Sequence, residues 1–530
     1  MTSCRLNLFP IELIQNLFEY FSTYEIFFSF INVSSYIDTI IFNYPDYRLD
    51  LKSIRRKQFD LICQHLIPEQ VISLVLADDG DTPGLVQLFL SRFEFNRFVR
   101  LQSLTLIEIE TKYWQTIISN LNHLRILKIY PSKSYCWKSR FLMRKDKDKF
   151  EKLILTNCNV LRICSLKYID TKQLSQLRHL IVKGEDLLTI QSILPIASQL
   201  RSLQITNISL DTSQLTELIC PFITLNRLTL EFSEGAVFID YIERILFNAP
   251  NLKHFELVAD LNDKSIINGE RWHDAVKNLT TFNFKFQLTF DLKPNDLDTY
   301  RTHFWIEEKC WFVAYQDQCL YSVPYFLETE TDEDFEYPEF STLVDNQLFL
   351  DRIKKFTIDI LLCDCKYQFN FVEDLFIPFV MPALTLQKIV SLNSIRYLTV
   401  RTVNSIIELQ QLIQSLPNLC HLKIRFFEND FSEEYSCQPM INIRKLHIQN
   451  HISLKHRIIQ QLAVAFPNVE HLSIETCCQG NNILQSLKKF SCLSTASFCY
   501  SDRHVLNQFL QTNSVDFHYR YDNFSIYLWI

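Results

Sequence analysis

A short hydrophobic pattern, with apolar residues at the first, fourth and sixth of six positions, recurs along most of this 530-residue chain. Successive copies begin 23 to 27 residues apart between Leu101 and Leu279, and 24 to 26 residues apart between Ile395 and Leu493. A unit this small cannot bury its own apolar face, so units of near-constant period bury it by stacking on one another. The chain is therefore predicted to fold as a solenoid. The copies begin at Val71, Leu101, Leu124, Phe150, Leu177, Leu200, Leu225, Leu252, Leu279, Ile353, Ile395, Leu419, Ile443, Val469 and Leu493.

The spacing inside each copy predicts a short β-strand. Its last two apolar residues lie two positions apart, so both point to one face of a strand and the residue between them points to the other. Helix-like segments such as residues 114–121 and 457–466 separate the copies, and prolines such as Pro250 and Pro417 stop these helices. Strand, turn, helix and return in this order resemble a leucine-rich-repeat horseshoe, an α/β fold. The alternative is a conventional α/β domain with leucine-rich strands, which does not require so many copies in nearly constant phase.

The repeats are degenerate and the array is interrupted. The turn position that is usually Asn or Cys in leucine-rich repeats varies here, and the pattern is lost between Phe284 and Ile353. In that interval the aromatic segments 304–312 and 321–326 predict one or two irregular strands, and the acidic run 328–339 predicts a solvated loop. A second insertion is expected near residues 363–386. The sequence leaves open whether the horseshoe is continuous or split into two arcs.

The first forty residues do not follow the repeat pattern and have apolar residues at helical spacing instead. Phe9-Pro10 predicts a turn that starts a helix, because proline suits the first helical position. Ser22-Thr23 then separates two amphipathic stretches. The apolar residues cover too much of the helix surface for so short a unit to bury them all. This indicates a helical module with an apolar surface left for a partner. The apolar positions at helical spacing in the first stretch are Leu13, Ile14, Leu17, Phe18 and Phe21.

Residues 5 to 45 resemble an F-box. Phe9-Pro10, Leu13-Ile14 and Val33-Ser34 match that motif in order and spacing, whereas Ser35-Tyr36 replaces the usual basic pair after the last of these. The resemblance implies docking on a Skp-family adaptor, which connects the chain to a cullin–RING ligase. The residues that it assigns to adaptor binding are Phe9, Pro10, Leu13, Ile14, Leu17, Phe18 and Phe21.

An F-box followed by leucine-rich repeats resembles the substrate-recognition subunit of an SCF-type E3 ubiquitin ligase. The horseshoe would hold the protein substrate, and the chemistry would belong to the recruited ubiquitin-conjugating enzyme. The alternative is a leucine-rich-repeat scaffold or regulator whose N-terminal helices act only as a solenoid cap. The predicted domains are an F-box at residues 1–48, a linker helix at 49–66, a first arc of repeats at 67–290, an aromatic and acidic insertion at 291–350 and a second arc at 351–530.

Composition argues against several other functions. Six glycines form no nucleotide-binding loop, and no catalytic or metal-binding signature is present, so we expect no enzyme activity, no cofactor and no metal. Sixteen cysteines without a C-x-x-C pair or a secretory leader favour free thiols in a cytoplasmic or nuclear protein. The longest apolar stretch, 375–386, is too short to span a membrane. A net charge of −7 gives no basic field for nucleic acid.

The outward-facing strand residues are the place to look for a substrate. They are mixed in the first arc and distinctly basic in the second, with Glu475 as an exception. Because parallel strands stack about 5 Å apart, the basic side chains would merge into one stripe that binds an acidic or phosphorylated segment. A solvated sheet face without a ligand is the alternative. A separate basic tract, at residues 52–57, is predicted to be a solvated linker helix. The predicted stripe residues are Arg401, His421, Lys423, Arg425, Lys445, His447 and His471.

Overall fold

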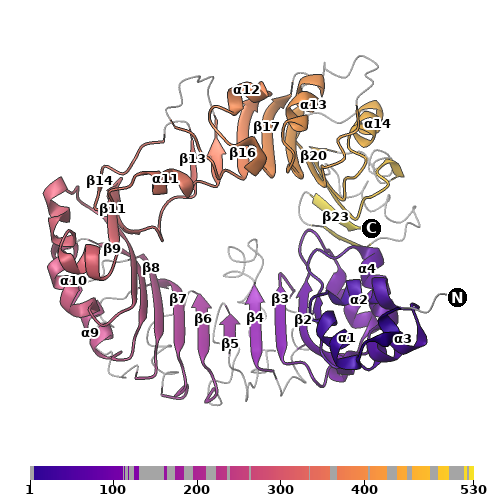
Figure 1. Ribbon diagram of the computed structural model, residues 1–530, viewed down its shortest axis with the longest axis horizontal. Helices are drawn as coiled ribbons and strands as arrows, with labels where there is room; N and C mark the ends of the chain where they lie inside the picture. The colour runs from indigo at the N-terminus through magenta and orange to yellow at the C-terminus, as the bar shows by residue number, and fades with distance from the viewer. Residues whose placement is uncertain are drawn as a thin grey trace.

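The chain forms a ring lined by two β-sheets, with helices on the outside (Figure 1). The computed structural model describes residues 5–110, 113, 117, 124–130, 160–163, 174–183, 195–209, 223–234, 239–261, 264–332, 335–358, 367–403, 406–426, 438–449, 456–477, 488–499, 518–521 and 525–530. Within these residues the sheets contain thirteen and ten strands. The architecture is a mixed α/β solenoid built mainly from parallel strands, like that of leucine-rich repeats.

The first sheet is parallel from β1 to β10 and ends in antiparallel strands. In spatial order it contains β1 (Tyr47–Asp50), β2 (Val71–Ala77), β3 (Ser103–Ile107), β4 (Ile126–Tyr130), β5 (Val160–Ile163), β6 (His179–Lys183), β7 (Ser202–Ser209), β8 (Arg227–Glu234), β9 (His254–Leu261), β10 (Thr281–Leu288), β12 (Cys319–Val323), β11 (Phe312–Gln316) and β14 (Phe340–Ser341).

The second sheet is parallel up to β21 and closes with an antiparallel hairpin. In spatial order it contains β13 (Glu330–Asp332), β15 (Lys355–Thr357), β16 (Asp374–Phe379), β17 (Tyr397–Val403), β18 (His421–Phe426), β19 (Lys445–Gln449), β20 (His471–Cys477), β21 (Thr495–Cys499), β23 (Ser525–Trp529) and β22 (His518–Tyr521). The helices along the array are α4 (Arg56–His65), α5 (Leu85–Arg92), α9 (Ile239–Phe247), α10 (Gly269–Val276), α11 (Gln347–Asp351), α12 (Ala383–Leu386), α13 (Ile406–Gln414) and α14 (His456–Ala465).

The repeat pattern determines which strand residues are buried. In β3, Leu104 and Leu106 are fully buried, and Thr105 between them is partly exposed on the concave side. The parallel register places Leu104 beside Leu127 of β4, so the apolar pairs of successive strands form continuous ladders. The same alignment holds in the second sheet, where Leu422 lies beside Leu446. Each repeat therefore covers the apolar surface of the one before it.

Three repeat strands differ from the sequence prediction. The sheet begins at β1, upstream of residue 67, because β1 pairs in parallel with β2. The strand between β4 and β6 is β5, and the predicted copy at 150–155 lies outside the described residues. Within the expected second insertion, β16 is an ordinary repeat strand with Leu375 and Ile377 buried. The long interval from Ile353 to Ile395 suggested an insertion, but it holds one more copy of the pattern, which begins at Val372.

The interruption contains two irregular strands, as expected, but the aromatic segment 304–312 is not one of them, because Phe304–Glu308 form a π-helix and β11 begins only at Phe312. Strands β11 and β12 pair antiparallel, and β12 continues the first sheet by pairing antiparallel with β10. The acidic run is only partly a loop, because β13 lies within it and pairs in parallel with β15. The described strands thus form two separate sheets, one ending at β14 and the other beginning at β13.

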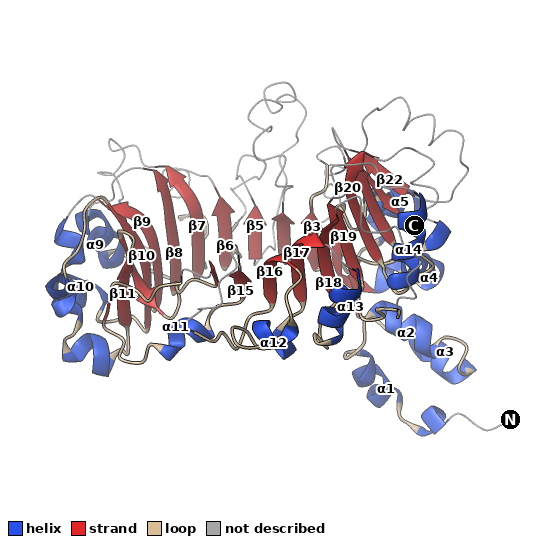
Figure 2. Ribbon diagram, turned by 90° about the horizontal axis from the view of Figure 1, so that it is seen from above, coloured by secondary structure: helices blue, strands red, loops and turns tan. Residues whose placement is uncertain are grey.

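The N-terminal helices are α1 (Ile11–Phe18), α2 (Thr23–Phe30) and α3 (Ser35–Phe42), and they project beyond the edge of the ring (Figure 2). Ser22 and Glu25 form a capping box at the start of α2, and Ser34 caps α3. The Thr23 hydroxyl donates a hydrogen bond of 2.9 Å to the Arg48 carbonyl, which fixes α2 on β1. This module therefore covers the open end of the first sheet.

We predict that Gly269→Ala destabilises the protein by about 1–3 kcal/mol, the usual cost of overpacking a core. A methyl group at Gly269 would lie 2.5 Å from the Thr299 carbonyl oxygen, and the Gly269 carbonyl also accepts a hydrogen bond from buried Trp305. Urea denaturation followed by tryptophan fluorescence measures the change. Gly80→Ala is the control, because its methyl group would make only an ordinary 3.5 Å contact with Tyr527. Equal midpoints for wild type and Gly269→Ala would contradict the prediction.

Candidate binding surfaces

Helix α1 and the residues around it expose a set of large apolar side chains, which we call the apolar face. Of the residues assigned to adaptor binding by resemblance, Phe9, Leu13, Leu17 and Phe21 are 48%, 54%, 37% and 37% exposed, and Pro10 is also exposed. The other members of the apolar face were not predicted, although the sequence shows each as an apolar residue next to the motif. They are Leu8, Ile11 and Tyr20, which are 84%, 46% and 86% exposed.

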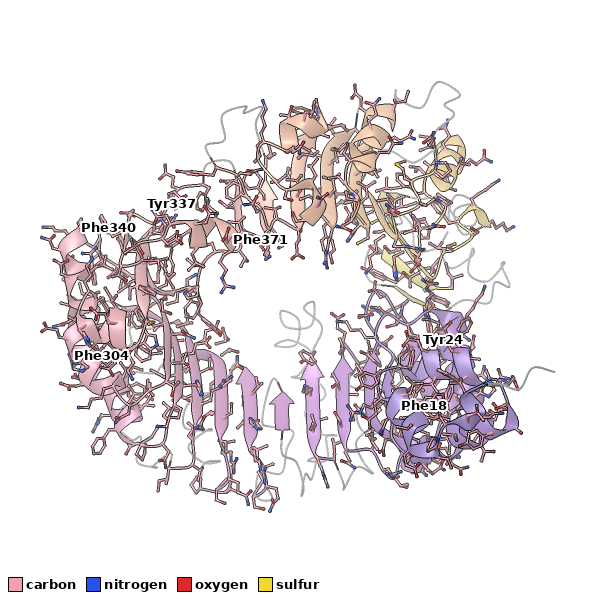
Figure 3. The ribbon with its side chains drawn as sticks, in the orientation of Figure 1. Phe18, Tyr24, Phe304, Tyr337, Phe340 and Phe371 are labelled. Atoms are coloured by element: carbon pink, nitrogen blue, oxygen red, sulfur yellow. The ribbon has the colours of Figure 1, made fainter. Side chains whose placement is uncertain are left out.

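Ile14 and Phe18, which the resemblance also assigns to adaptor binding, do not belong to the apolar face, because this structure buries their side chains. Their side chains are 3% and 1% exposed, and Figure 3 shows Phe18 inside the helical module. The Phe18 ring packs 5.4 Å from that of Phe30 and 5.6 Å from that of Tyr44. Residues four apart share one stripe of a helix, so Leu13 and Leu17 form one stripe, and Ile14 and Phe18 form the adjacent one.

The basic stripe of the second sheet consists of two aligned columns. His421, Lys445 and His471 lie beside one another on β18, β19 and β20, and Lys423 lies beside His447 in the next column. Arg425 follows at the end of β18, beside Gln449. Arg401 of β17 is exposed, but it lies where the register between β17 and β18 shifts. The structure therefore brings six of the seven predicted residues together and sets Arg401 slightly apart.

Burial changes the charge of this stripe. It lowers the pKa of His421 to about 4, with the neighbouring Lys445 and His447 contributing further, and it also lowers the pKa values of His447 and His471. All three imidazoles are therefore neutral at pH 7. The positive charge comes from Lys423, Lys445 and the arginines, a distinction that residue types alone could not make.

Two carboxylates already approach the basic stripe. Glu475 Oε1 lies 3.0 Å from His447 Nε2, and its other oxygen accepts a 2.6 Å hydrogen bond from Gln449. Asp81 Oδ2 lies 3.7 Å from Lys445 Nζ and comes from the opposite end of the array. The stripe is thus a surface on which carboxylates are accommodated beside lysine and histidine.

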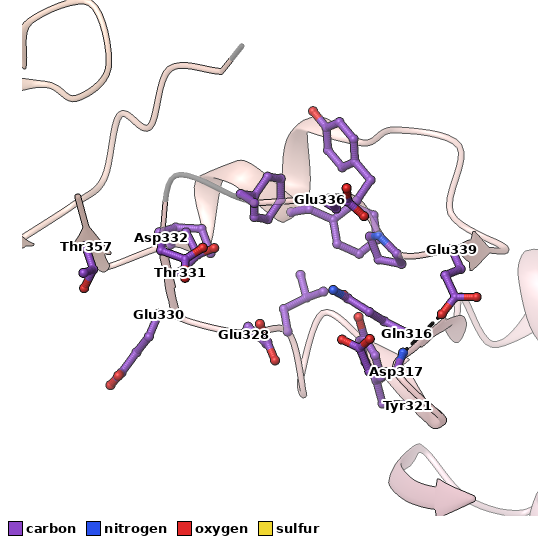
Figure 4. A pocket seen from close by; sticks show the side chains of 16 residues that line it. Gln316, Asp317, Tyr321, Glu328, Glu330, Thr331, Asp332, Glu336, Glu339 and Thr357 are labelled. Atoms are coloured by element: carbon purple, nitrogen blue, oxygen red, sulfur yellow. Dashed lines mark hydrogen bonds between the residues drawn. The ribbon is translucent and has the colours of Figure 1, made fainter. Parts of the chain in front are cut away.

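A cavity of about 680 Å³ lies between the β11–β12 hairpin and the start of the second sheet (Figure 4). Carboxylates and aromatic rings line it, and Glu339 accepts a 3.3 Å hydrogen bond from the backbone N–H of Asp317. Glu330 forms an ion pair with Lys355. The sequence predicted only a solvated loop in this segment. The acidic lining residues are Asp317, Glu328, Glu330, Asp332, Glu336 and Glu339.

The described residues offer little else for chemistry. Among them, no three His, Cys, Asp or Glu side chains are placed to hold a metal ion. Burial raises the pKa of the Cys63 thiol to about 12 and that of Cys319 to about 11, so both thiols are protonated at neutral pH and poorly nucleophilic. Within the same part of the chain, no helix has the length and apolarity needed to cross a membrane.

We predict that stability falls between pH 7.5 and pH 5.5 and that His421→Gln reduces this fall. The folded-state pKa of His421 lies near 4, below the value of about 6.5 in an unfolded chain. The unfolded state therefore binds more protons over this interval, so the free energy of unfolding decreases as the pH decreases. Urea midpoints at the two pH values measure the effect. His303→Gln, at a histidine that is 77% exposed, is the control, and an unchanged pH dependence in His421→Gln would contradict the prediction.

No family model matches the chain, and no curated protein matches it. Among solved structures, the chain is similar to one described as "Crystal structure of TLR13-ssRNA13 complex", with 12% sequence identity and a TM-score of 0.22. The similarity covers 82% of this chain and 56% of that chain, so this chain spans little more than half of its length.

Proposed function

We propose that this protein is the substrate-recognition subunit of an SCF-type E3 ubiquitin ligase. In this proposal the N-terminal helices bind a Skp-family adaptor, and the concave face of the repeats holds a protein substrate. The observation that supports it most directly is the apolar face of α1, which stays exposed although the core of the helical module is complete.

The apolar face has the character of a binding surface. Leu13 and Leu17 lie one turn apart on α1, Phe21 follows the end of the helix and Phe9 precedes its start. Large contiguous apolar surface on a folded protein is typical of a site that another protein covers. The segment before α1 is held in place, because the Tyr36 hydroxyl donates a 2.9 Å hydrogen bond to the Phe9 carbonyl. A partner would therefore meet a largely preorganised surface.

The cap function alone does not account for this surface. Capping is provided by α2, which bonds to β1 through Thr23, and by the Phe27 ring, which packs 5.3 Å from Tyr47. Neither contact involves Leu13 or Leu17. The alternative, a leucine-rich-repeat scaffold or regulator with a purely structural N-terminus, leaves the exposure of these leucines unexplained.

The proposal divides the work between the two ends of the protein. The adaptor would tie the chain to a cullin and a RING protein, and the repeats would hold the substrate near the recruited ubiquitin-conjugating enzyme. Raising the effective concentration of a substrate lysine is sufficient for this function, so the chain needs no catalytic residue of its own. A cytoplasmic or nuclear location fits these partners. The basic stripe favours a substrate with an acidic or phosphorylated segment, without a role for nucleic acid or membrane.

We predict that Leu13→Ala combined with Leu17→Ala abolishes binding of a Skp-family adaptor. Central apolar anchors commonly contribute about 2 kcal/mol or more each to binding, and both side chains are exposed, so the fold should be retained. Co-purification of the full chain with the adaptor at moderate salt measures binding, and circular dichroism monitors folding. Phe247→Ala is the matched control, because Phe247 is an 86% exposed apolar residue on α9.

A second double variant separates binding from stability. Ile14→Ala with Phe18→Ala removes core side chains, so we expect it to destabilise the helical module by about 2–5 kcal/mol per site. Adaptor binding that persists in Leu13→Ala/Leu17→Ala would contradict the proposal. A folded wild-type chain that binds no adaptor would favour the scaffold.

A further inference from the structure

The last strand of the chain joins the two ends of the repeat array. Successive residues of a strand point to opposite faces, and β23 uses both. Ile526 and Leu528 are fully buried in the core of the second sheet. Trp529 is fully buried in the core that contains the N-terminal helices and the first sheet. One strand therefore completes two cores that are far apart in the sequence.

Specific contacts fix Trp529 against the beginning of the array. Its indole N–H donates a 2.9 Å hydrogen bond to the Ile54 carbonyl, and its ring lies 5.3 Å from that of Phe59. The Arg56 guanidinium lies 5.2 Å from the same ring, and Arg55 forms an ion pair with Glu470 of the second arc. Lys52, Arg55 and Lys57 of the basic tract are exposed as predicted, but the helix begins only at Arg56, and Arg55 and Arg56 take part in closing the ring.

The loop between β2 and α5 lies at this junction and contains three aspartates. Two of them are used within the loop. Asp79 Oδ1 accepts hydrogen bonds of 3.1 Å from the backbone N–H groups of Asp81 and Thr82, and Asp78 Oδ1 accepts one of 2.6 Å from Gly84. Arg520 of β22 donates a hydrogen bond to the Asp78 carbonyl, which holds the loop against the C-terminal hairpin.

The third carboxylate points away from the loop and onto the basic stripe. Asp81 Oδ2 accepts a 2.9 Å hydrogen bond from the Ser53 hydroxyl and lies 3.7 Å from Lys445 Nζ. Lys445 occupies the middle of the column formed with His421 and His471. Because both imidazoles are neutral at pH 7, Asp81 is paired with the cation of this column.

We propose that Asp81 is an internal occupant of the basic stripe: its carboxylate, brought there by closure of the ring, lies where an anionic partner would bind. Such a partner must therefore displace Asp81 from Lys445. This inference rests on the proposed function, in which the stripe holds the substrate. Lys445 and Asp81 are 42% and 37% exposed, and ion pairs with this exposure contribute at most about 1 kcal/mol. The contact is therefore weak enough to yield to a multivalent anionic segment, whereas buried Trp529 keeps the ends of the array together.

The test uses the full chain and a fluorescein-labelled hexaglutamate peptide, with binding measured by fluorescence anisotropy at low salt. We expect Asp81→Asn to raise the affinity for this peptide up to about five-fold. Asp274→Asn is the control, because it removes the same charge from an 82% exposed side chain on α10 and should leave the affinity unchanged. In a Lys445→Gln background the gain from Asp81→Asn should disappear, as expected for two residues that act through one contact.

The possible outcomes separate this inference from the function on which it rests. If wild type and Asp81→Asn bind the peptide with equal, measurable affinity and Lys423→Gln binds it more weakly, Asp81 is not an internal occupant. The same result would support anion binding by the basic stripe. Equal gains from Asp81→Asn and Asp274→Asn would also overturn the internal occupant, because the effect would then reflect net charge. No binding of the peptide by any variant would overturn both the internal occupant and the assignment of the stripe. Adaptor binding is measured separately and does not depend on this result.

Discussion

Burial of one apolar pair per strand is the constraint on which the rest of this structure depends. A pair such as Leu104 and Leu106 is buried only if the parallel strands on both sides place their own apolar pairs beside it. Each strand is therefore stabilised by its neighbours, and the outward-facing positions between the buried residues are free to vary. The antiparallel hairpin β11–β12 extends the first sheet without following the repeat pattern. The repeats thus provide a stable surface on which charge can change without loss of the fold.

The two candidate surfaces arise from this arrangement in different ways. The basic stripe follows from parallel register, which places one side chain from each strand in the same column. The apolar face follows from a helical module that needs only one side for capping, so that α1 keeps a second apolar stripe in solvent. One surface is carried by the array and the other by its end. Under the proposed function, the apolar face would hold the adaptor and the basic stripe the substrate.

The local hydrophobic pattern of the sequence predicted the repeat strands well. For example, the burial of Leu446 and Ile448 depends only on their spacing. It could not decide which stripe of α1 faces the core, since Ile14 and Leu13 are equally apolar and the choice is made by Phe30 and Tyr44. It also could not predict that the three histidines of the basic stripe are neutral, because their protonation depends on burial between strands. Contacts between distant segments, such as Trp529 with Ile54, leave no periodic signal in the sequence.

The contact between Trp529 and Ile54 has a consequence for synthesis of the protein. These residues are separated by 475 positions, so the surface around Phe59 stays uncovered until Trp529 has been made. The middle repeats can stack in order as they emerge from the ribosome, because each contacts mainly its neighbours. The first repeat, although made early, is among the last parts to be completed. A nascent chain would therefore expose the apolar surface around Phe59 until Trp529 is made and covers it.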